Sequence, residues 1–589
     1  MAAMPAQSDS GARPPPAAAR PSHPSEPSRR TVLKKIRGMT LEEKVGQLFM
    51  TYAYGRSVDD TSFEMVAANK QAHGVATAQQ LLRRYHLGGI VYTSWSGNTI
   101  NPRQIARLSN GIQRVSGHEG AGIPALVATD QEGGLIARVG TPATSFPGAM
   151  ALGAARSPAV ARAAARVMGE ELAAMGINQN LAPVADVNRD PSNPVIGVRS
   201  FGSRPRLVSA LAAAQVRGYQ DGAGIAATAK HFPGHGDTDT DSHTGLPVIR
   251  HTRKQVQELD LAPFRSAIRA GVGAIMTAHI QVPSLDDSGR PATLSRPILT
   301  GVLREKLGFN GVIVTDALIM AGVRSAFGDE RVPVEAIEAG ADVLLMPPDI
   351  GVAYDAVLRA VRGGQISEGR IDRSVRRILR LKEMLGLFDE AHVDDRAVRG
   401  SVGTEKHEWA AARVAAAGVT LVRNVKGLLP IGQRSGTPVL VAGWEQGVVA
   451  SLAGHLGKLR VRTDPLVTGA SPTPGLIAEA VRRAGGSDDV AVVVASGARS
   501  HPGQGELVRA LAATGTPVVA VAAGEPYDMA TFGGARASLA TYDSGDVSMN
   551  ALAKVLVAEI NPSGRLPVAV PGPDGAPLYR FGRGLRYEH

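Results

Sequence analysis

The sequence contains no cysteine. Disulfide bonds and thiolate metal sites are therefore excluded, and the composition fits a reducing compartment. No run of about 18 apolar residues occurs, so we expect no membrane-spanning helix. Arg29-Arg30 is followed within a few residues by Lys34, Lys35 and Arg37 and not by a long apolar segment, which argues against an intact signal peptide. We expect a cytoplasmic protein, or a secreted one if a signal peptide has been removed.

Nucleotide-binding motifs are also missing. No GxGxxG follows an apolar run and no Walker A sequence is present, so a nucleotide site is not indicated. The formal charge of +11 and the pI near 9.9 invite a nucleic-acid interpretation. However, the arginines are spread through Ala/Arg/Gly/Val-rich helical stretches, without a long basic block interleaved with aromatic residues. We therefore expect no nucleic-acid partner.

The length of 589 residues is too great for one hydrophobic core, so we expect two or three domains. Thr40 and Glu43 have the spacing of a capping box at the start of a helix. Short, β-branched apolar runs then alternate with amphipathic stretches. Eight runs within residues 35–390 predict a (β/α)8 barrel, with a doubly wound sheet as the alternative. The runs are residues 46–52, 88–94, 125–130, 181–187, 227–232, 274–280, 311–317 and 342–347.

The rest of the chain divides into three segments. Residues 1–34 predict a disordered tail rich in Pro, Ala and Arg. After a basic amphipathic helix, residues 391–404 predict a linker that leads away from the barrel. Residues 405–589 predict an α/β sandwich domain with a mostly parallel sheet. Its expected strands are residues 420–423, 438–442, 490–495, 517–523 and 537–542, and its expected helices 405–417, 476–484, 505–513 and 549–558.

Chemically capable side chains stand at the C-terminal ends of five of the barrel runs. In a barrel the loops after the strands converge at that edge, so we expect these side chains to form one site. A dense cluster follows one run, because residues 230–243 (KHFPGHGDTDTDSH) hold three histidines, one lysine and three aspartates. The residues at the strand ends are Asp130, Asp186, Lys230 with His231, His279 and Asp316.

Asp316 ends an apolar run, where a carboxylate is costly unless it is paired or takes part in chemistry. It could act as the nucleophile toward a sugar anomeric carbon in a retaining glycosidase. Such an enzyme also needs a proton donor that later acts as a base. His243 fits this role, because Asp241 two residues earlier can face the same side and fix the tautomer of the imidazole.

Lys230, Arg138 and Arg199 are hydrogen-bond donors suited to sugar hydroxyls or an acetamido carbonyl, and Asp130 can accept from two hydroxyls. An ordinary ion-pair network at the barrel rim is the alternative interpretation. A metal site is disfavoured, because no His-x-x-x-His helical pattern is present and Lys230 would repel a cation. The side chains with ligand-type atoms are His231, His235, Asp237, Asp241 and His243.

Several motifs together resemble glycoside hydrolase family 3, in particular its β-N-acetylglucosaminidases of the NagZ type. Residues 230–236 (KHFPGHG) and 241–243 (DSH) resemble the signature of these enzymes. The segments 130–134 (DQEGG) with Arg138, and 193–201 (NPVIGVRSF), resemble their sugar-binding segments. Three more segments resemble the nucleophile strand and the end of the second domain. They are residues 311–320, 561–568 and 581–585.

The resemblance implies a role for each matching residue. Asp316 would be the nucleophile and His243 the general acid/base, with Asp241 as its partner. The β-glucosidase branch takes its acid/base from the second domain, whereas here a barrel loop would supply it. Leu135-Ile136 departs from the Arg-Val often found in the family, which affects only a peripheral contact. The residues expected to bind N-acetylglucosamine in the −1 subsite are Asp130, Arg138, Arg199, Lys230 and His231.

We therefore expect a retaining exo-β-N-acetylglucosaminidase that works through a covalent glycosyl-enzyme and needs no cofactor. Its substrate would be a small glycan, either a peptidoglycan fragment or a chitooligosaccharide, and the protein would be a monomer. A β-N-acetylglucosaminide phosphorylase or a β-glucosidase of the same family is the nearer alternative. A non-catalytic protein that binds cell-wall glycans is the more distant one.

Overall fold

The computed structural model describes residues 26–431, 438–485 and 489–588, with side chains from residue 31 onward. Eight strands pair in parallel in the order β10-β1-β2-β3-β6-β7-β8-β9. A parallel bridge between Val314 and Val343 joins the two ends, so the predicted barrel is confirmed. The strands are β1 (Phe49–Thr51), β2 (Gly89–Tyr92), β3 (Leu126–Thr129), β6 (Gln179–Asn180), β7 (Ala226–Phe232), β8 (Ala274–Thr277), β9 (Val312–Val314) and β10 (Leu344–Leu345).

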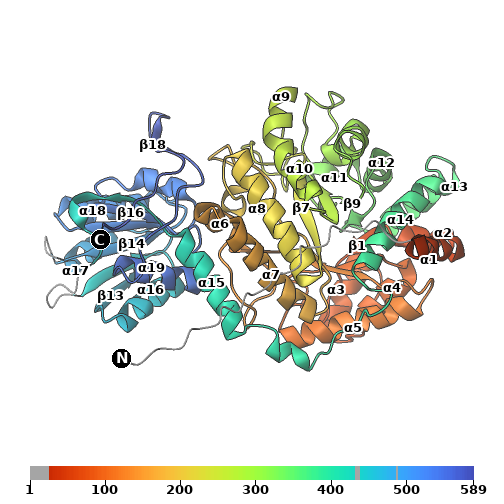
Figure 1. Cartoon of the computed structure of the whole chain (residues 1–589), viewed down its shortest axis with the longest axis horizontal. Helices are drawn as coiled ribbons and strands as arrows, with labels where there is room; N and C mark the ends of the chain where they lie inside the picture. Colours follow the sequence, from red (N-terminus) through yellow and green to blue (C-terminus); the bar gives the residue numbers. More distant parts are fainter. Residues whose placement is uncertain (1–25, 432–437, 486–488, 589) are drawn as a thin grey trace, which may run out of the picture.

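Helices connect the strands and cover the outside of the barrel (Figure 1). Thr40 caps α2 through the predicted capping box with Glu43. A small hairpin, β4 (Gln131–Gly133) and β5 (Ile136–Ala137), follows β3. The helices are α1 (Glu26–Gly38), α2 (Leu41–Gly46), α3 (Phe63–His73), α4 (Ala78–Tyr85), α5 (Pro102–His118), α6 (Ala149–Ala155), α7 (Pro158–Ala174), α8 (Pro205–Arg217), α9 (Arg253–Gln255), α10 (Leu261–Arg269), α11 (Ala321–Phe327), α12 (Arg331–Ala339), α13 (Ile350–Arg362) and α14 (Glu368–Met384).

Three expectations need correction. The fourth strand is not the run at residues 181–187 but β6, which consists of the two residues directly before that run. Pro183 has no N–H to donate, so the regular ladder is interrupted there. The run still hydrogen-bonds its neighbours, through the Leu181 N–H to Thr129 and through a bridge between Val184 and Lys230. Helix α1 occupies the last part of the predicted tail, whose residues 1–25 lie outside the described residues. The predicted linker does not lead away from the barrel, because Asn110 of α5 exchanges two hydrogen bonds with the Val393 backbone.

The C-terminal part forms the expected α/β sandwich. Its sheet has the order β11-β16-β15-β14-β12-β13, parallel except for β11 against β16. The edge strand β13 and helix α16 are additions to the predicted elements, and β13 escaped prediction because it contains Asp464-Pro465 and is largely exposed. The elements are β11 (Thr420–Asn424), β12 (Val439–Gly443), β13 (Thr463–Val467), β14 (Ala491–Ala495), β15 (Val518–Ala522), β16 (Ala537–Ala540), α15 (Glu405–Gly418), α16 (Gln446–Lys458), α17 (Pro474–Arg483), α18 (Gly503–Ala513), α19 (Asp546–Leu556), and the hairpin β17 (Val570–Pro571) with β18 (Pro577–Tyr579).

Alternate residues of the central strands enter two different cores. On β14, Ala491, Val493 and Ala495 pack into one core, whereas Val492 and Val494 pack into the other. This period of two is what a sheet buried on both faces requires. The first of these cores also takes in side chains of α6, which lies with α15 between the sandwich and the barrel (Figure 1). Among the described residues, no helix is long and apolar enough to cross a membrane.

Candidate active site

One pocket opens at the C-terminal ends of the barrel strands. All the predicted site residues except Asp241 line it. The same pocket is also lined by Glu132 and His235 and, toward its mouth, by apolar side chains including Trp95 and Ile319. The strand-end residues from opposite halves of the sequence therefore converge, as the barrel interpretation predicts.

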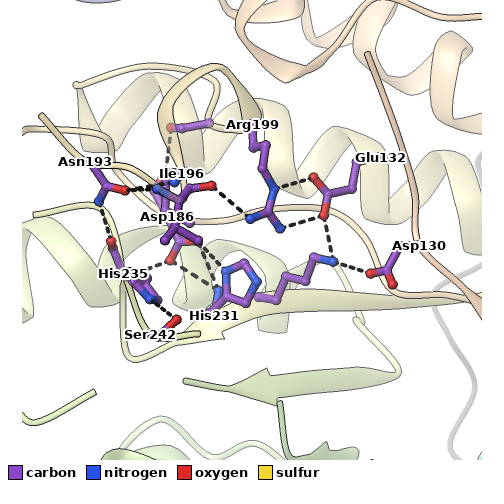
Figure 2. Close-up of polar contacts among 12 residues, drawn as sticks. Asp130, Glu132, Asp186, Asn193, Ile196, Arg199, His231, His235 and Ser242 are labelled. Carbon is purple, nitrogen blue, oxygen red and sulfur yellow. Dashed lines mark hydrogen bonds and ion pairs between the residues drawn. The ribbon is translucent and has the colours of Figure 1, made fainter. Parts of the chain in front are cut away.

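A network of alternating charges forms the floor of this pocket (Figure 2). The Lys230 ammonium lies 2.6 Å from Asp130 Oδ1 and 2.7 Å from Glu132 Oε1. Glu132 also accepts two hydrogen bonds from Arg199, at 2.9 Å from Nε and 2.8 Å from Nη2. A further bond from Arg199 Nη1 to the Val195 carbonyl, at 3.0 Å, fixes the guanidinium to its own loop.

The protonation of this network follows from its geometry. Burial alone would raise the pKa of Glu132, but the adjacent Arg199 and Lys230 hold that pKa well below its usual value. Burial would lower the pKa of Lys230, yet Asp130 and Glu132 raise it. The floor therefore presents fixed charges, and the Asp130 carboxylate, with its side chain 25% exposed, faces the open part of the pocket.

Asp186 organises the second half of the floor (Figure 2). It is fully buried, and its Oδ2 lies 2.7 Å from His231 Nδ1. It also accepts hydrogen bonds from the backbone N–H groups of His231 and His235, at 3.2 Å and 2.8 Å. A carboxylate that holds Nδ1 of an imidazole leaves Nε2 as the ring nitrogen available to the pocket.

Asp316 follows β9 and is partly exposed to the pocket. Its Oδ1 accepts a hydrogen bond from the Ala317 N–H at 2.8 Å. Burial would raise its pKa, but the nearby His231 and His279, the Ala317 N–H and Lys230 lower it. Asp316 is therefore an anion. Its Oδ1 is held by a hydrogen bond and its other carboxylate oxygen is open to the pocket, as a nucleophile requires.

The loop after β7 carries the proposed dyad. Asp241 Oδ1 accepts the backbone N–H of His243 and lies 2.8 Å from its Nδ1. The side chain of His243 is 61% exposed and borders the pocket, whereas Asp241 stands behind it and does not line the pocket. The structure thus brings the two side chains together at the spacing of two residues that the sequence suggests.

The same loop is tied down on both sides of the dyad. His235 is buried, and its Nε2 lies 2.8 Å from the hydroxyl of Ser242, the residue before His243. Burial and the nearby His231 lower the pKa of His235 to about 4, so this ring is neutral. Asp237, earlier in the loop, pairs with His251 at its far end, and the other nitrogen of that ring lies 2.7 Å from Asp260.

The assignment of site residues from sequence missed Glu132, and it placed Asp186 and His279 at the same edge of the barrel without giving them a role. Glu132 stands in the DQEGG segment, and the need to neutralise both Lys230 and Arg199 was the signal for it. His279 is fully buried, with Nδ1 at 2.8 Å from Thr293 and Nε2 at 3.2 Å from the Ala317 carbonyl. It therefore supports the turn after Asp316 from below.

Two further features of the pocket concern the Arg138 side chain and the possibility of a metal site. The Arg138 guanidinium lines the pocket and has no side-chain ion pair or hydrogen bond within the part of the chain that the structure describes. It is thus the cation in the pocket that remains available to a ligand. No group of three or more His, Asp or Glu side chains in the described ranges is arranged to hold a metal ion.

Comparison with known families agrees with this architecture. The glycosyl hydrolase family 3 N terminal domain matches residues 40–381, and the glycosyl hydrolase family 3 C-terminal domain matches residues 419–587. The chain belongs to glycosyl hydrolase family 3. The first of these two family domains is the barrel, and the second is the α/β sandwich.

Two curated relatives and one solved structure show which members of the family this chain is similar to. Beta-hexosaminidase A of Pseudoalteromonas piscicida is 39% identical over 376 residues, which is 60% of this chain and 62% of that protein. The beta-N-acetylglucosaminidase/beta-glucosidase of Cellulomonas fimi is 32% identical over 69% of this chain and 68% of its own length. A solved family 3 beta-N-acetylglucosaminidase from Paenibacillus sp. str. FPU-7 superposes with a TM-score of 0.79 at 36% identity, covering 90% of this chain and 99% of that one.

Proposed function

We propose that this protein is a retaining exo-β-N-acetylglucosaminidase that releases terminal β-linked N-acetylglucosamine from peptidoglycan fragments or chitooligosaccharides. The observation that carries the proposal is the presence, in one pocket, of the anionic Asp316 and of His243 held by Asp241. The names of the relatives, beta-hexosaminidase and beta-N-acetylglucosaminidase, support the same choice of sugar.

In the first step an Asp316 oxygen attacks the anomeric carbon of the bound sugar, and the bond to the leaving oxygen breaks. His243 donates its proton to that oxygen. Because Nδ1 of His243 faces Asp241, the proton is donated from Nε2. In the second step neutral His243 removes a proton from water, which attacks the same carbon and releases Asp316. Two inversions at one carbon give retention of configuration.

The floor residues bind the sugar while these steps proceed. Asp130 accepts hydroxyl protons, and Lys230 and Arg199 supply donors that their carboxylate partners have already oriented. His231, held through Nδ1 by Asp186, presents Nε2 to the sugar. Arg138 adds a donor with no partner within the described residues. Because the network is already in place, little reorganisation is needed when the substrate binds, which favours catalysis.

The nucleophile assignment is tested with Asp316→Ala on p-nitrophenyl and 2,4-dinitrophenyl β-N-acetylglucosaminides. Turnover should fall by at least about 10³-fold, and added azide should restore activity with formation of the α-glycosyl azide. Asp239→Ala is the matched control, because Asp239 is an exposed aspartate on the loop after β7 and does not line the pocket. Unchanged turnover by Asp316→Ala would rule out the mechanism.

Phosphate could replace water in the second step, because the imidazole of His243 repels phosphate less than a carboxylate acid/base would. Product analysis with and without inorganic phosphate separates the two reactions. Free N-acetylglucosamine in both conditions supports hydrolysis, whereas N-acetylglucosamine 1-phosphate identifies a phosphorylase. Faster turnover of aryl β-glucosides than of aryl β-N-acetylglucosaminides would instead identify a β-glucosidase.

A further inference from the structure

Trp95 is a large apolar side chain that remains half exposed at the mouth of the active-site pocket. Its exposed fraction is 51%, and it lines the same pocket as Asp316 and His243. The floor of that pocket is polar and charged, so a tryptophan at its mouth serves a different kind of contact. A single exposed apolar residue is ordinary on a protein surface, and the argument therefore depends on how this one is held.

The turn that carries Trp95 is fixed by buried polar groups. The Thr93 N–H donates to Asn98 Oδ1 at 3.0 Å, and the hydroxyls of Thr93 and Ser96 lie 2.7 Å apart. Asn98 donates to the Ala53 carbonyl at 3.1 Å, which anchors the turn to the segment after β1. Thr93, Ser96 and Asn98 are all buried, so the exposure of Trp95 is built into a rigid turn.

Aromatic neighbours hold the indole itself. The rings of Tyr52 and Tyr54 lie 4.6 Å and 5.6 Å from the Trp95 ring, at interplanar angles of 73° and 59°. Such tilted contacts restrict the rotamer of the indole and leave the rest of its surface free. A preordered aromatic surface of this kind binds an apolar ligand face at low entropic cost.

The other exposed apolar side chain of the pocket is Ile319, three residues after Asp316. Its exposed fraction is 38%, and Met320 and Met346 line the pocket beside it. Trp95 follows β2 and Ile319 follows β9, and β10 and β1 lie between these strands in the barrel. The mouth therefore has apolar walls on two sides, above the charged network around Lys230.

We propose that Trp95 and Ile319 form the subsite for the second sugar ring of the substrate, and that this ring is an uncharged β-linked N-acetylhexosamine, as in chitooligosaccharides. The inference rests on the proposed exo-glycosidase function. The terminal ring occupies the charged floor, so the ring beyond the leaving oxygen must cross the mouth beside His243. The C–H faces of a pyranose ring suit an indole.

The charge near the mouth favours an uncharged second ring over a carboxylated one. Asp241 stands beside His243, and its side chain is 36% exposed. Hydrogen bonds from His243 lower the pKa of Asp241 although burial opposes this, so it is an anion at neutral pH. A carboxylate on the leaving sugar would be repelled by it, and Trp95 and Ile319 offer no charged partner for it. Arg138, the cation of the pocket without a side-chain partner among the described residues, is assigned to the terminal ring.

The test compares Trp95→Ala and Trp95→Phe with wild type on two substrates. N,N′-diacetylchitobiose has the second ring, whereas N-acetyl-β-glucosaminyl fluoride has none. For Trp95→Ala, kcat/KM on chitobiose should fall about ten-fold or more, and on the fluoride it should stay within about two-fold. Trp95→Phe should lose less. Trp409→Ala is the matched control, because Trp409 is 61% exposed on α15 and does not line the pocket.

An equal ratio of the two activities in wild type and in both variants would overturn the subsite. If Trp95→Ala loses both activities through misfolding, the ratio in Trp95→Phe decides in the same way. A wild-type enzyme that prefers a disaccharide whose second ring carries a carboxylate would overturn the choice of an uncharged ring. If the wild-type enzyme turned over neither chitobiose nor the fluoride, the proposed function itself would be contradicted. That result is distinguishable from a failure of the subsite.

Discussion

The Glu132 carboxylate accepts two hydrogen bonds from one edge of the Arg199 guanidinium, formed by Nε and Nη2, although the two residues lie 67 positions apart in the chain. The pair joins the hairpin after β3 to the loop after β6, and its carboxylate also holds Lys230. The side chain of Glu132 is 5% exposed. Because one buried anion neutralises two buried cations, its removal should disturb both the stability and the shape of the floor.

Glu132→Gln should destabilise the protein by about 3 kcal/mol and lower kcat/KM at least about 100-fold, because two buried cations lose their shared counter-ion. Thermal unfolding and steady-state kinetics measure the two effects. Asp130→Asn is the comparison, since it removes a more exposed partner of Lys230 and should chiefly raise KM. Equal losses of stability in the two variants would contradict the central role of Glu132.

His243→Ala should lose about 10²–10⁴-fold in kcat/KM on chitobiose, and far less on 2,4-dinitrophenyl N-acetylglucosaminide, whose leaving group needs no proton. Asp241→Asn should lose less than His243→Ala on the same disaccharide, because it keeps a hydrogen-bond partner near Nδ1 and removes only the charge. Asp239→Asn serves as the control. A larger loss in Asp241→Asn than in His243→Ala would be incompatible with an orienting role.

The Asp237–His251–Asp260 contact should make stability depend on pH. Hydrogen bonds from His251 to Asp237 and to Asp260 raise the pKa of the imidazole to about 9, from about 6.5 when unfolded. A raised pKa means that the stabilisation is fully present below about pH 6.5 and is lost as pH rises through about 9. Arg189, 3.8 Å from Asp237, is the nearby cation.

Comparing wild type with His251→Gln by thermal unfolding checks this expectation. Wild type should be more stable by roughly 1–2 kcal/mol at pH 6, and the difference should shrink by pH 9.5. His392→Gln, at an exposed histidine of the segment after α14, should show no such trend. A difference that stays constant across this range would mean that His251 does not titrate there.

Gly197 is one of the places where the second domain approaches the loop that carries Arg199. Its φ is +41°, and a Cβ built there would lie 2.3 Å from Glu525 Oε1. Gly197→Ala should therefore displace the loop that carries Arg199, with a loss of about ten-fold in kcat/KM. Adding Glu525→Ala should recover part of that loss, because it removes the clash but not the left-handed backbone. No recovery in the double variant would show that Glu525 does not set the loop position.

The barrel was predictable because most of its strands lie in short apolar runs that alternate with amphipathic helices over a length typical of a barrel, with a doubly wound sheet as the alternative. The fourth strand was misplaced because β6 is the polar pair Gln179–Asn180, whose burial depends on tertiary hydrogen bonds, such as the one from Asn180 to the Gln131 carbonyl. Edge strand β13 escaped for a related reason, since exposure gives it no apolar pattern.

The contacts of the candidate site also fall into those that the sequence predicts and those that it does not. The Asp241–His243 contact was predictable because it is local, and the structure brings the two side chains together as expected. The Glu132 ion pairs, the Asp186–His231 contact and the exposed Trp95 were not, because each depends on which strand ends meet around the barrel.

The sequence by itself determined the alternation of strands and helices, and with it the edge at which the chemical groups gather. It also determined the local dyad and the strand-end position of Asp316. Only the tertiary structure decided which carboxylates neutralise which cations, since the partners lie far apart in the chain. Those pairings decide which charges neutralise one another and which, at Arg138 and Asp316, remain available to a substrate.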